Sequence, residues 1–132
     1  MSESVDKCET RQCKAVFPGT LNANDTLFGG LLMQWMDEVA FLTATRHTRQ
    51  KMFTITVENL KFRKPIRPNS LVELIGYVEK AGPVRLKVKV DTYVEELYGM
   101  ERELAVEGVF YFSAVDENGH PIRLKNPGTK TV

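Results

Sequence analysis

Cysteine is scarce in this sequence of 132 residues, which contains only Cys8 and Cys13. Two thiols near one end are too few for a disulfide framework, so we expect a reducing compartment, by default the cytoplasm. The first residues lack the basic and apolar segments of a signal peptide. No stretch approaches the roughly 20 consecutive apolar residues of a membrane-spanning helix, and no membrane partner is therefore expected.

The sequence also lacks an excess of charge of either sign. Lys and Arg number 18 and Asp and Glu number 17, which leaves a net charge of +1. Because the chain has no bulk attraction to polyanions, nucleic acid is not expected as a partner. Any anionic ligand must be held by a local basic cluster or not at all. Two clusters occur, each equally compatible with solvated strand ends: Arg63, Lys64 and Arg67, and Arg85, Lys87 and Lys89.

Several catalytic motifs are missing. None of the four serines lies in a Gly-x-Ser-x-Gly turn, which argues against a serine hydrolase. His47 and His120 share no metal-ligand spacing with each other or with the cysteines. No phosphate-binding or dinucleotide-binding glycine motif is present. The sequence therefore predicts neither a metal nor a redox cofactor.

One long helical pattern dominates the sequence. From residue 27 to about residue 47, apolar residues cover most of the helix circumference, which predicts a buried helix. Gln34, Glu38 and Thr45 form a narrow polar stripe on it. The interior candidates Trp35, Met36 and Phe41 could form the floor of a ligand tunnel.

Alternating apolar and polar residues around this helix predict strands. One short strand is expected before the helix, at 13–17, and four after it, at 53–62, 71–78, 86–94 and 106–114. A slip of the alternation at Glu58–Asn59 predicts a β-bulge. Because the connections are short, the strands are antiparallel, and one helix on such a sheet gives an α+β domain. We expect an N-terminal arm at 1–12, a single domain at 13–125 and a tail at 126–132, frayed beyond Pro121.

Asp37 stands out on the helix because its row of neighbours is small or apolar. Aspartate is a poor helix former and is rarely buried without a partner. One interpretation is a structural carboxylate that reaches an arginine or a backbone amide. The other is a desolvated carboxylate held in a cleft for chemistry. The pattern alone leaves both open.

The residues that open the helix have two interpretations as well. Gly29 and Gly30 could serve close packing, or could let a ligand oxygen approach the free N–H groups of the first turn. Asn22 could shape the turn before the helix, or could orient a water or a carbonyl group. Each signal is weak when it is taken alone.

Taken together, the run from Asn22 to Asp37, NANDTLFGGLLMQWMD, resembles the signature of the hotdog-fold acyl-CoA thioesterases. It looks most like the bacterial short-chain and the cytosolic acyl-CoA hydrolases. The resemblance continues through 56–62, Pro65 and 114–119, and covers about residues 10–125. It implies a hotdog fold, a curved antiparallel sheet wrapped around one long central helix. It also implies an enzyme that hydrolyses acyl-CoA to free CoA and a carboxylic acid.

The resemblance implies roles for particular residues. Asp37 would be the general base or, less favoured, a nucleophile, Asn22 would position water or carbonyl, and the N–H of Gly30 or Leu31 would polarise the thioester. The substrate-binding candidates are Gly29, Leu31, Thr56, Arg63, Lys64 and Arg85, and coenzyme A enters only as part of the substrate. The family places the asparagine and the aspartate of one site on different chains of a homodimer, which often assembles into a hexamer. Distance favours the same arrangement. Gly30 and Asp37 are about 10 Å apart along one helix, so one helix can hardly supply both the oxyanion donor and the base to the same thioester carbon.

Two departures from the family pattern occur. Asp25 stands where relatives have glycine, and aspartate is among the residues that tolerate a left-handed backbone. Pro83–Val84 replaces a coenzyme-contacting turn, where Arg85 is a possible substitute. A non-catalytic acyl-CoA sensor remains an alternative function. A hotdog dehydratase is disfavoured, because His47 and His120 lie far from the start of the helix.

Overall fold

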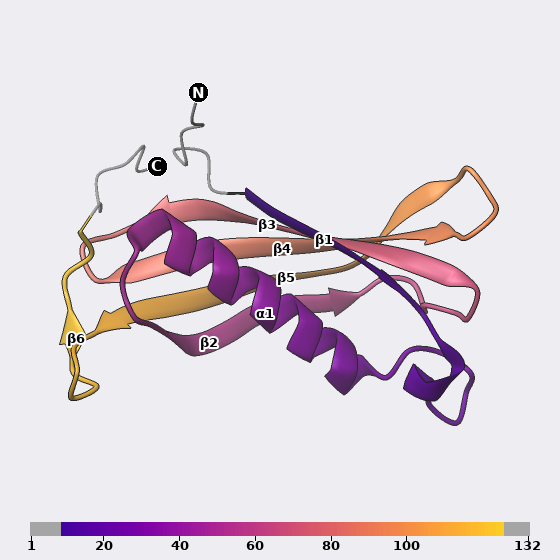
Figure 1. The fold of residues 1–132 in the computed structure, drawn as a ribbon, viewed down its shortest axis with the longest axis horizontal. Coiled ribbons are helices and arrows are strands. Elements are labelled where there is room, and N and C mark those ends of the chain that lie inside the picture. The colour runs from indigo at the N-terminus through magenta and orange to yellow at the C-terminus, as the bar shows by residue number, and fades with distance from the viewer. Residues whose placement is uncertain (1–8, 126–132) are drawn as a thin grey trace.

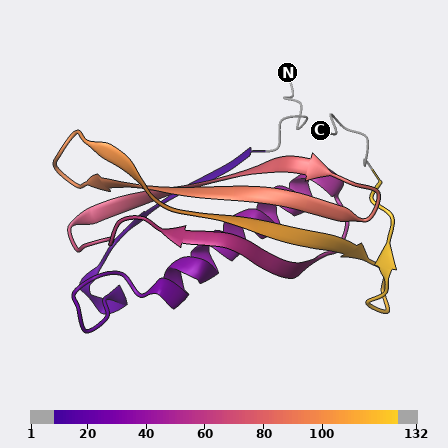
Figure 2. The same ribbon diagram turned by 180° about the vertical axis from the view of Figure 1, so that it is seen from behind.

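A 20-residue helix, α1 (Gly29–Thr48), lies across one face of a six-stranded antiparallel sheet (Figure 1). The computed structural model describes residues 9–125. Viewed from behind, the other face of the sheet is not covered by any described helix (Figure 2). The sheet order is β1-β3-β4-β5-β2, with β6 beside β5. The elements are β1 (Glu9–Ala15), the 3-10 helix η1 (Pro18–Thr20), α1, β2 (Met52–Phe62), β3 (Ser70–Ala81), β4 (Arg85–Glu96), β5 (Arg102–Val115) and β6 (Pro121–Ile122).

The predicted α+β class and the four long strands are confirmed, and the two ends differ from expectation. β1 begins at Glu9 and pairs with β3 as far as Tyr77, which places residues 9–12 in the sheet and not in an arm. Beyond Pro121, the chain adds the short strand β6 and buries Leu124, whose N–H donates to the carbonyl of Pro83 (2.9 Å). The expectation of fraying directly after Pro121 is therefore wrong. The rest of the expected arm, including Cys8, and the expected tail at 126–132 lie outside the described residues.

The helix is buried on the side that faces the sheet. Val39, Ala40 and Ala44 are fully buried there. On the opposite side, Phe41 is 43% exposed and Leu42 is 37% exposed. The single chain therefore buries the helix on the sheet side only, and its apolar outer side needs a second surface to cover it. The three expected tunnel-floor residues also diverge: Met36 is buried under the helix, Phe41 is exposed, and Trp35 lies beneath the ammonium group of Lys14.

Strand β2 forms one edge of the sheet and is irregular. The predicted bulge is confirmed by a register shift against β5 between Glu58 and Lys61, where Asn59 has a φ of 52°. A second shift, between Thr54 and Thr56, was not expected from the sequence. Large apolar side chains of this strand are exposed in the single chain: Phe53, Ile55 and Phe62. An apolar edge strand of this kind indicates a surface that a further chain can cover.

The close approach of α1 to β3 depends on Gly76. A Cβ atom at this position would lie 2.7 Å from Thr43 Oγ1 and 2.9 Å from Val39 Cγ1. We expect Gly76→Ala to lower the free energy of unfolding by about 1–3 kcal/mol, because the helix must move away from the sheet. Gly19→Ala is the matched control, since nothing lies within 4 Å of its Cβ position. Equal denaturation midpoints in urea for the two variants would contradict this account.

Candidate active site

The loop before α1 is built around the side chain of Asn22. Its Oδ1 accepts the N–H of Asn24 (2.8 Å) and of Thr26 (3.2 Å), and its Nδ2 donates to Thr26 Oγ1 (3.0 Å). Asp25 completes the loop with a φ of 58°, so the expected left-handed backbone at this position is confirmed. Asn22 therefore shapes the turn, as the first interpretation proposed. Since its amide nitrogen carries two hydrogens, one donor is still available to a ligand.

A cavity of about 370 Å³ lies between this loop, the start of α1 and the end of β2. Asn22, Thr26 and Lys64 supply its polar lining. Its apolar lining consists of Leu27, Leu32, Phe62, Pro65, Ile66 and Val106, and Gly29 completes it. A cavity with an apolar wall and a few polar groups at one end suits an acyl chain next to a polar reacting group.

The first turn of α1 is open at this cavity. Phe28 is the N-cap residue, and no side chain of the described residues caps the helix. The first intrahelical bond runs from Leu32 N–H to the carbonyl of Phe28 (3.0 Å), so the N–H groups of Gly29, Gly30 and Leu31 precede it. Gly30 is exposed and has nothing within 4 Å of its Cβ position. These free donors at the positive end of the helix can stabilise an oxyanion.

Asp37 lies two turns further along the helix, half-buried beside strand β2. Its Oδ1 accepts a hydrogen bond from Thr54 Oγ1 (2.9 Å). Among the described residues it makes no ion pair, so the structural interpretation with an arginine partner is not what the fold shows. The hydroxyl of Thr54 leaves the other carboxylate oxygen available for a water molecule.

Thr54 is a contact that the sequence analysis missed. Thr56, the threonine expected from the sequence, lies on the other side of the register shift. A strict two-residue alternation places both threonines on one face, and only the shift between them separates their surroundings. No signal in the sequence marked this second irregularity.

Asp37 and the Asn22 cavity are separate within one chain. Asp37 does not line the cavity, and its distance from Gly30 along the helix axis is about 10 Å. A thioester carbon needs its oxyanion donor and its attacking water within about 3 Å. One chain therefore brings together Asn22, Gly29 and Lys64, but leaves Asp37 at a distance too large for the same carbon.

The basic candidates have different surroundings. Arg63 pairs with Glu107, and the hydrogen bond from Arg63, supported by one from Lys89, lowers the pKa of Glu107 below its ordinary value. Arg63 is therefore already engaged by a carboxylate. Arg85 makes no ion pair within the described residues, but it starts β4 opposite Ser113, while Lys64 lies beside Ala105 at the other end of β5.

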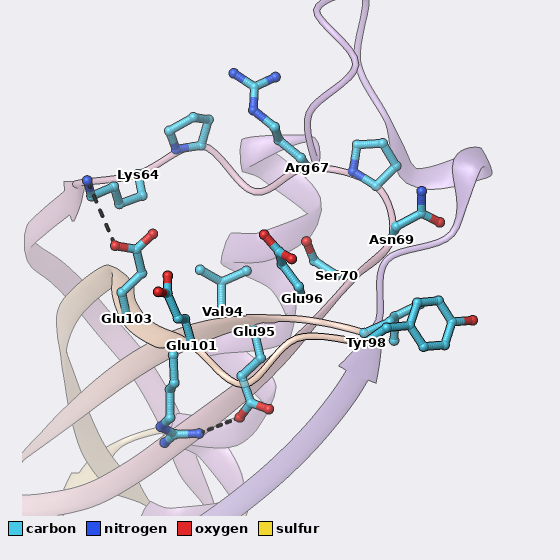
Figure 3. Close-up of a pocket in the computed structure, with 14 residues that line it drawn as sticks. Lys64, Arg67, Asn69, Ser70, Val94, Glu95, Glu96, Tyr98, Glu101 and Glu103 are labelled. Atoms are coloured by element: carbon cyan, nitrogen blue, oxygen red, sulfur yellow. Dashed lines mark hydrogen bonds and ion pairs between the residues drawn. The ribbon is translucent and has the colours of Figure 1, made fainter.

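Lys64 also lines a second, larger cavity of about 780 Å³, between the 64–70 loop and the β4–β5 hairpin (Figure 3). Tyr98 stands at the rim of this cavity, and Val94 lies inside it.

Within residues 9–125, no cluster of three or more His, Cys, Asp or Glu side chains could hold a metal ion. No helix in the same range combines the length and apolar composition needed to span a bilayer.

The fold and this site define a hotdog-type enzyme scaffold, and comparison with known proteins gives its family. Residues 24–99 match the pattern of the thioesterase superfamily. An uncharacterised acyl-CoA thioester hydrolase of Bacillus subtilis is 38% identical over 122 residues, which cover 86% of this chain and 71% of that one. A second, from Haemophilus influenzae, is 33% identical over 129 residues, covering 90% and 84%. The chain belongs to the thioesterase superfamily, and the predicted family is confirmed.

Solved structures of relatives share the fold. The acyl-CoA hydrolase of Staphylococcus aureus, in complex with butyryl-CoA and CoA, has a TM-score of 0.85 at 28% identity, covering 92% of this chain and 74% of that one. A hexameric acyl-CoA thioesterase has a TM-score of 0.87 at 28% identity, covering 97% and 85%. The predicted hotdog fold is therefore confirmed.

Other structures of the Staphylococcus aureus enzyme carry alanine in place of one aspartate, one threonine and one asparagine. In that enzyme, the asparagine, the aspartate and the threonine follow one another in the same order and at the same spacing as Asn22, Asp37 and Thr54 in this chain. The sequence pointed to Asn22 and Asp37, and the structure adds Thr54 through its hydrogen bond to Asp37.

Proposed function

We propose that this thioesterase hydrolyses acyl-CoA thioesters in sites that two chains share, with Asp37 from one chain and Asn22 and Gly30 from its partner. The observation that carries the proposal is the separation of two half-sites in one chain. One half has an uncapped helix start, an apolar cavity and an amide donor. The other half has a carboxylate held by Thr54.

The half-sites divide the chemistry between them. Asp37 removes a proton from a water molecule, which attacks the thioester carbonyl. The N–H of Gly30, or of Leu31 next to it, stabilises the negative charge that develops on the carbonyl oxygen. Asn22 uses its second amide hydrogen to orient the carbonyl or the water. The C–S bond then breaks, and the CoA thiolate leaves as the thiol by taking up the proton that Asp37 removed from the water. A direct attack by the Asp37 carboxylate, forming an anhydride, is the second mechanism compatible with this arrangement.

The exposed apolar side chains support the shared site. Phe41 and Leu42 on the helix and Phe53, Ile55 and Phe62 on edge strand β2 are large apolar side chains that stay exposed in the single chain. A second copy related by a two-fold axis would bury these side chains against their own counterparts. If the two helices run antiparallel, the start of one lies beside the middle of the other, which brings Gly30 near the partner's Asp37. Dimers of this kind could assemble further into the hexamer that relatives form.

Lys64 is the best candidate for the phosphates of CoA, because it lies between the Asn22 cavity and the second cavity, and its only ion pair within residues 9–125 is exposed and long. Gly29, Leu31 and Thr56 remain proposed substrate contacts. Arg85 is proposed for the partner's site, and Arg63 is the weakest candidate because Glu107 already binds it. We propose that the reaction needs no metal and no cofactor beyond the CoA of the substrate.

A hydrolysis screen tests the proposed function directly. The purified protein is mixed with acyl-CoAs from acetyl to palmitoyl, and the free thiol is measured. We expect turnover that is strongest for acyl chains that fill a cavity of about 370 Å³. Tight binding of acyl-CoA without release of thiol would instead support the alternative, a non-catalytic acyl-CoA sensor.

Asn22→Ala tests the amide donor. We expect kcat to fall by about ten- to a hundredfold, because a carbonyl or water that is misplaced by about 1 Å reacts that much more slowly. Stability should also fall by about 1 kcal/mol, since the loop bonds are lost. Thr26→Val is the control, because it removes both hydrogen bonds between the Thr26 hydroxyl and the Asn22 side chain and keeps the Asn22 amide. Equal losses of kcat in the two variants would show that Asn22 acts only on the loop.

A further inference from the structure

Lys64 is placed between two cavities of different chemical character. It lines the Asn22 cavity on one side and the larger cavity under the β4–β5 hairpin on the other. Its backbone is fixed, because its N–H donates to the carbonyl of Ala105 (3.1 Å). The side chain is 55% exposed, so its four-carbon stem is free to direct the ammonium group to either cavity.

The hairpin side of the larger cavity is acidic. Four carboxylates line it: Glu95, Glu96, Glu101 and Glu103. Arg102, which lies among them, is already bound by Glu95 (2.9 Å) and Glu73 (2.7 Å). Arg67 lines the same cavity but points away from the hairpin (Figure 3). Lys64 is therefore the cation on the loop that faces the acidic hairpin.

The ammonium group of Lys64 contacts one of these carboxylates. Its Nζ lies 3.9 Å from Oε2 of Glu103, and Figure 3 shows the two side chains directed toward each other. The Glu103 side chain is 59% exposed, so this is a solvated ion pair that exchanges easily. A phosphate group carries more charge and more acceptor oxygens than a carboxylate, and competes well for the same ammonium group.

We infer that Glu103 is a positioning residue, which holds Lys64 on the hairpin in the free enzyme and yields it to a phosphate of CoA in the complex. The inference rests on the proposed function. In this arrangement Glu103 lowers the affinity for the phosphate-bearing part of the substrate and leaves the reacting part unaffected. The ion pair thus sets how strongly the enzyme prefers CoA thioesters to thioesters without phosphates.

Steady-state kinetics of Glu103→Gln test the inference with two substrates that carry the same acyl group, acyl-CoA and S-acyl pantetheine. We expect KM for acyl-CoA to fall by about two- to fivefold, the size of an exposed ion pair, with kcat unchanged. KM for S-acyl pantetheine, which has no phosphate, should not change. The difference should also shrink as salt is added, because exposed charges are screened.

Glu101→Gln is the matched control, because it removes the same charge from the same cavity without touching an ion pair of Lys64. Lys64→Met supplies a second background, in which Glu103→Gln should no longer change KM for acyl-CoA. The inference is overturned if Glu101→Gln has the same effect, or if the effect persists without Lys64, since Glu103 would then only repel phosphate. If the unmodified protein itself shows no turnover of acyl-CoA, the proposed function is rejected instead.

Discussion

Asp37→Asn is expected to lower kcat/KM for acyl-CoA by about 10²–10⁴-fold while the protein remains folded. The amide has the same shape as the carboxylate, and its oxygen can still accept the hydrogen bond from Thr54. It cannot take a proton from water, so the chemical step loses its base. Free thiol release measures the rate, and circular dichroism of the variant confirms the fold.

Glu38→Gln provides the control for Asp37→Asn. Glu38 is the next residue along the helix, is exposed, and accepts a hydrogen bond from Gln34 (3.4 Å). Removing its charge changes the net charge of the chain by the same amount, and should leave kcat/KM nearly unchanged. A loss of less than fivefold in Asp37→Asn, or equal losses in both variants, would remove Asp37 from the mechanism.

The elements could be predicted from the sequence because their patterns are strong. The strands alternate over eight or more residues and are bounded by Gly, Pro and Asn, and the long apolar run from residue 27 can only be a helix. The strand expected at 13–17 begins earlier, at Glu9, and this start was missed because its pattern is polar: Arg11 and Cys13 are exposed at the edge of the sheet. Such a strand is stabilised by its pairing with β3, and this pairing cannot be predicted from the local sequence of the strand.

The site could be predicted only in part, for a related reason. Asp37 was detectable as an acid among apolar neighbours, and Asn22 by its place before the helix. Thr54 was not detectable, because a register shift on β2 decides which threonine contacts Asp37. The partners of the basic residues were equally hidden: Glu107, which binds Arg63, lies on a distant strand. Contacts between segments far apart in the sequence depend on the register of the sheet.

The exposed side chains of α1 show which part of the predicted burial a single chain does not provide. Its sequence is apolar on most sides, yet a single chain has only one sheet to cover it. The pattern therefore fits the helix in the proposed dimer, in which a partner would cover the side that carries Phe41 and Leu42. The exposed apolar side of the helix thus supports the proposal that two chains share the site.

Mixing two impaired variants is expected to restore activity above that of either one if the site is shared. In a mixed dimer of Asn22→Ala and Asp37→Ala chains, one site combines both substitutions and the other combines two unsubstituted residues. Random exchange makes half of the dimers mixed, and each has one of its two sites intact. The rate should therefore recover to about a quarter of the rate of the unmodified protein at equal mixing.

The experiment needs proof of exchange, which tagged chains and co-purification supply. Mixing each variant with itself under the same conditions gives the background rate. If both residues act within one chain, every site of the mixed dimer keeps one defect, and the rate stays at that background. Recovery therefore separates the two arrangements, since it is expected only if the Asn22 and the Asp37 of one site come from different chains, as we propose from the distance of about 10 Å between Gly30 and Asp37 on one helix.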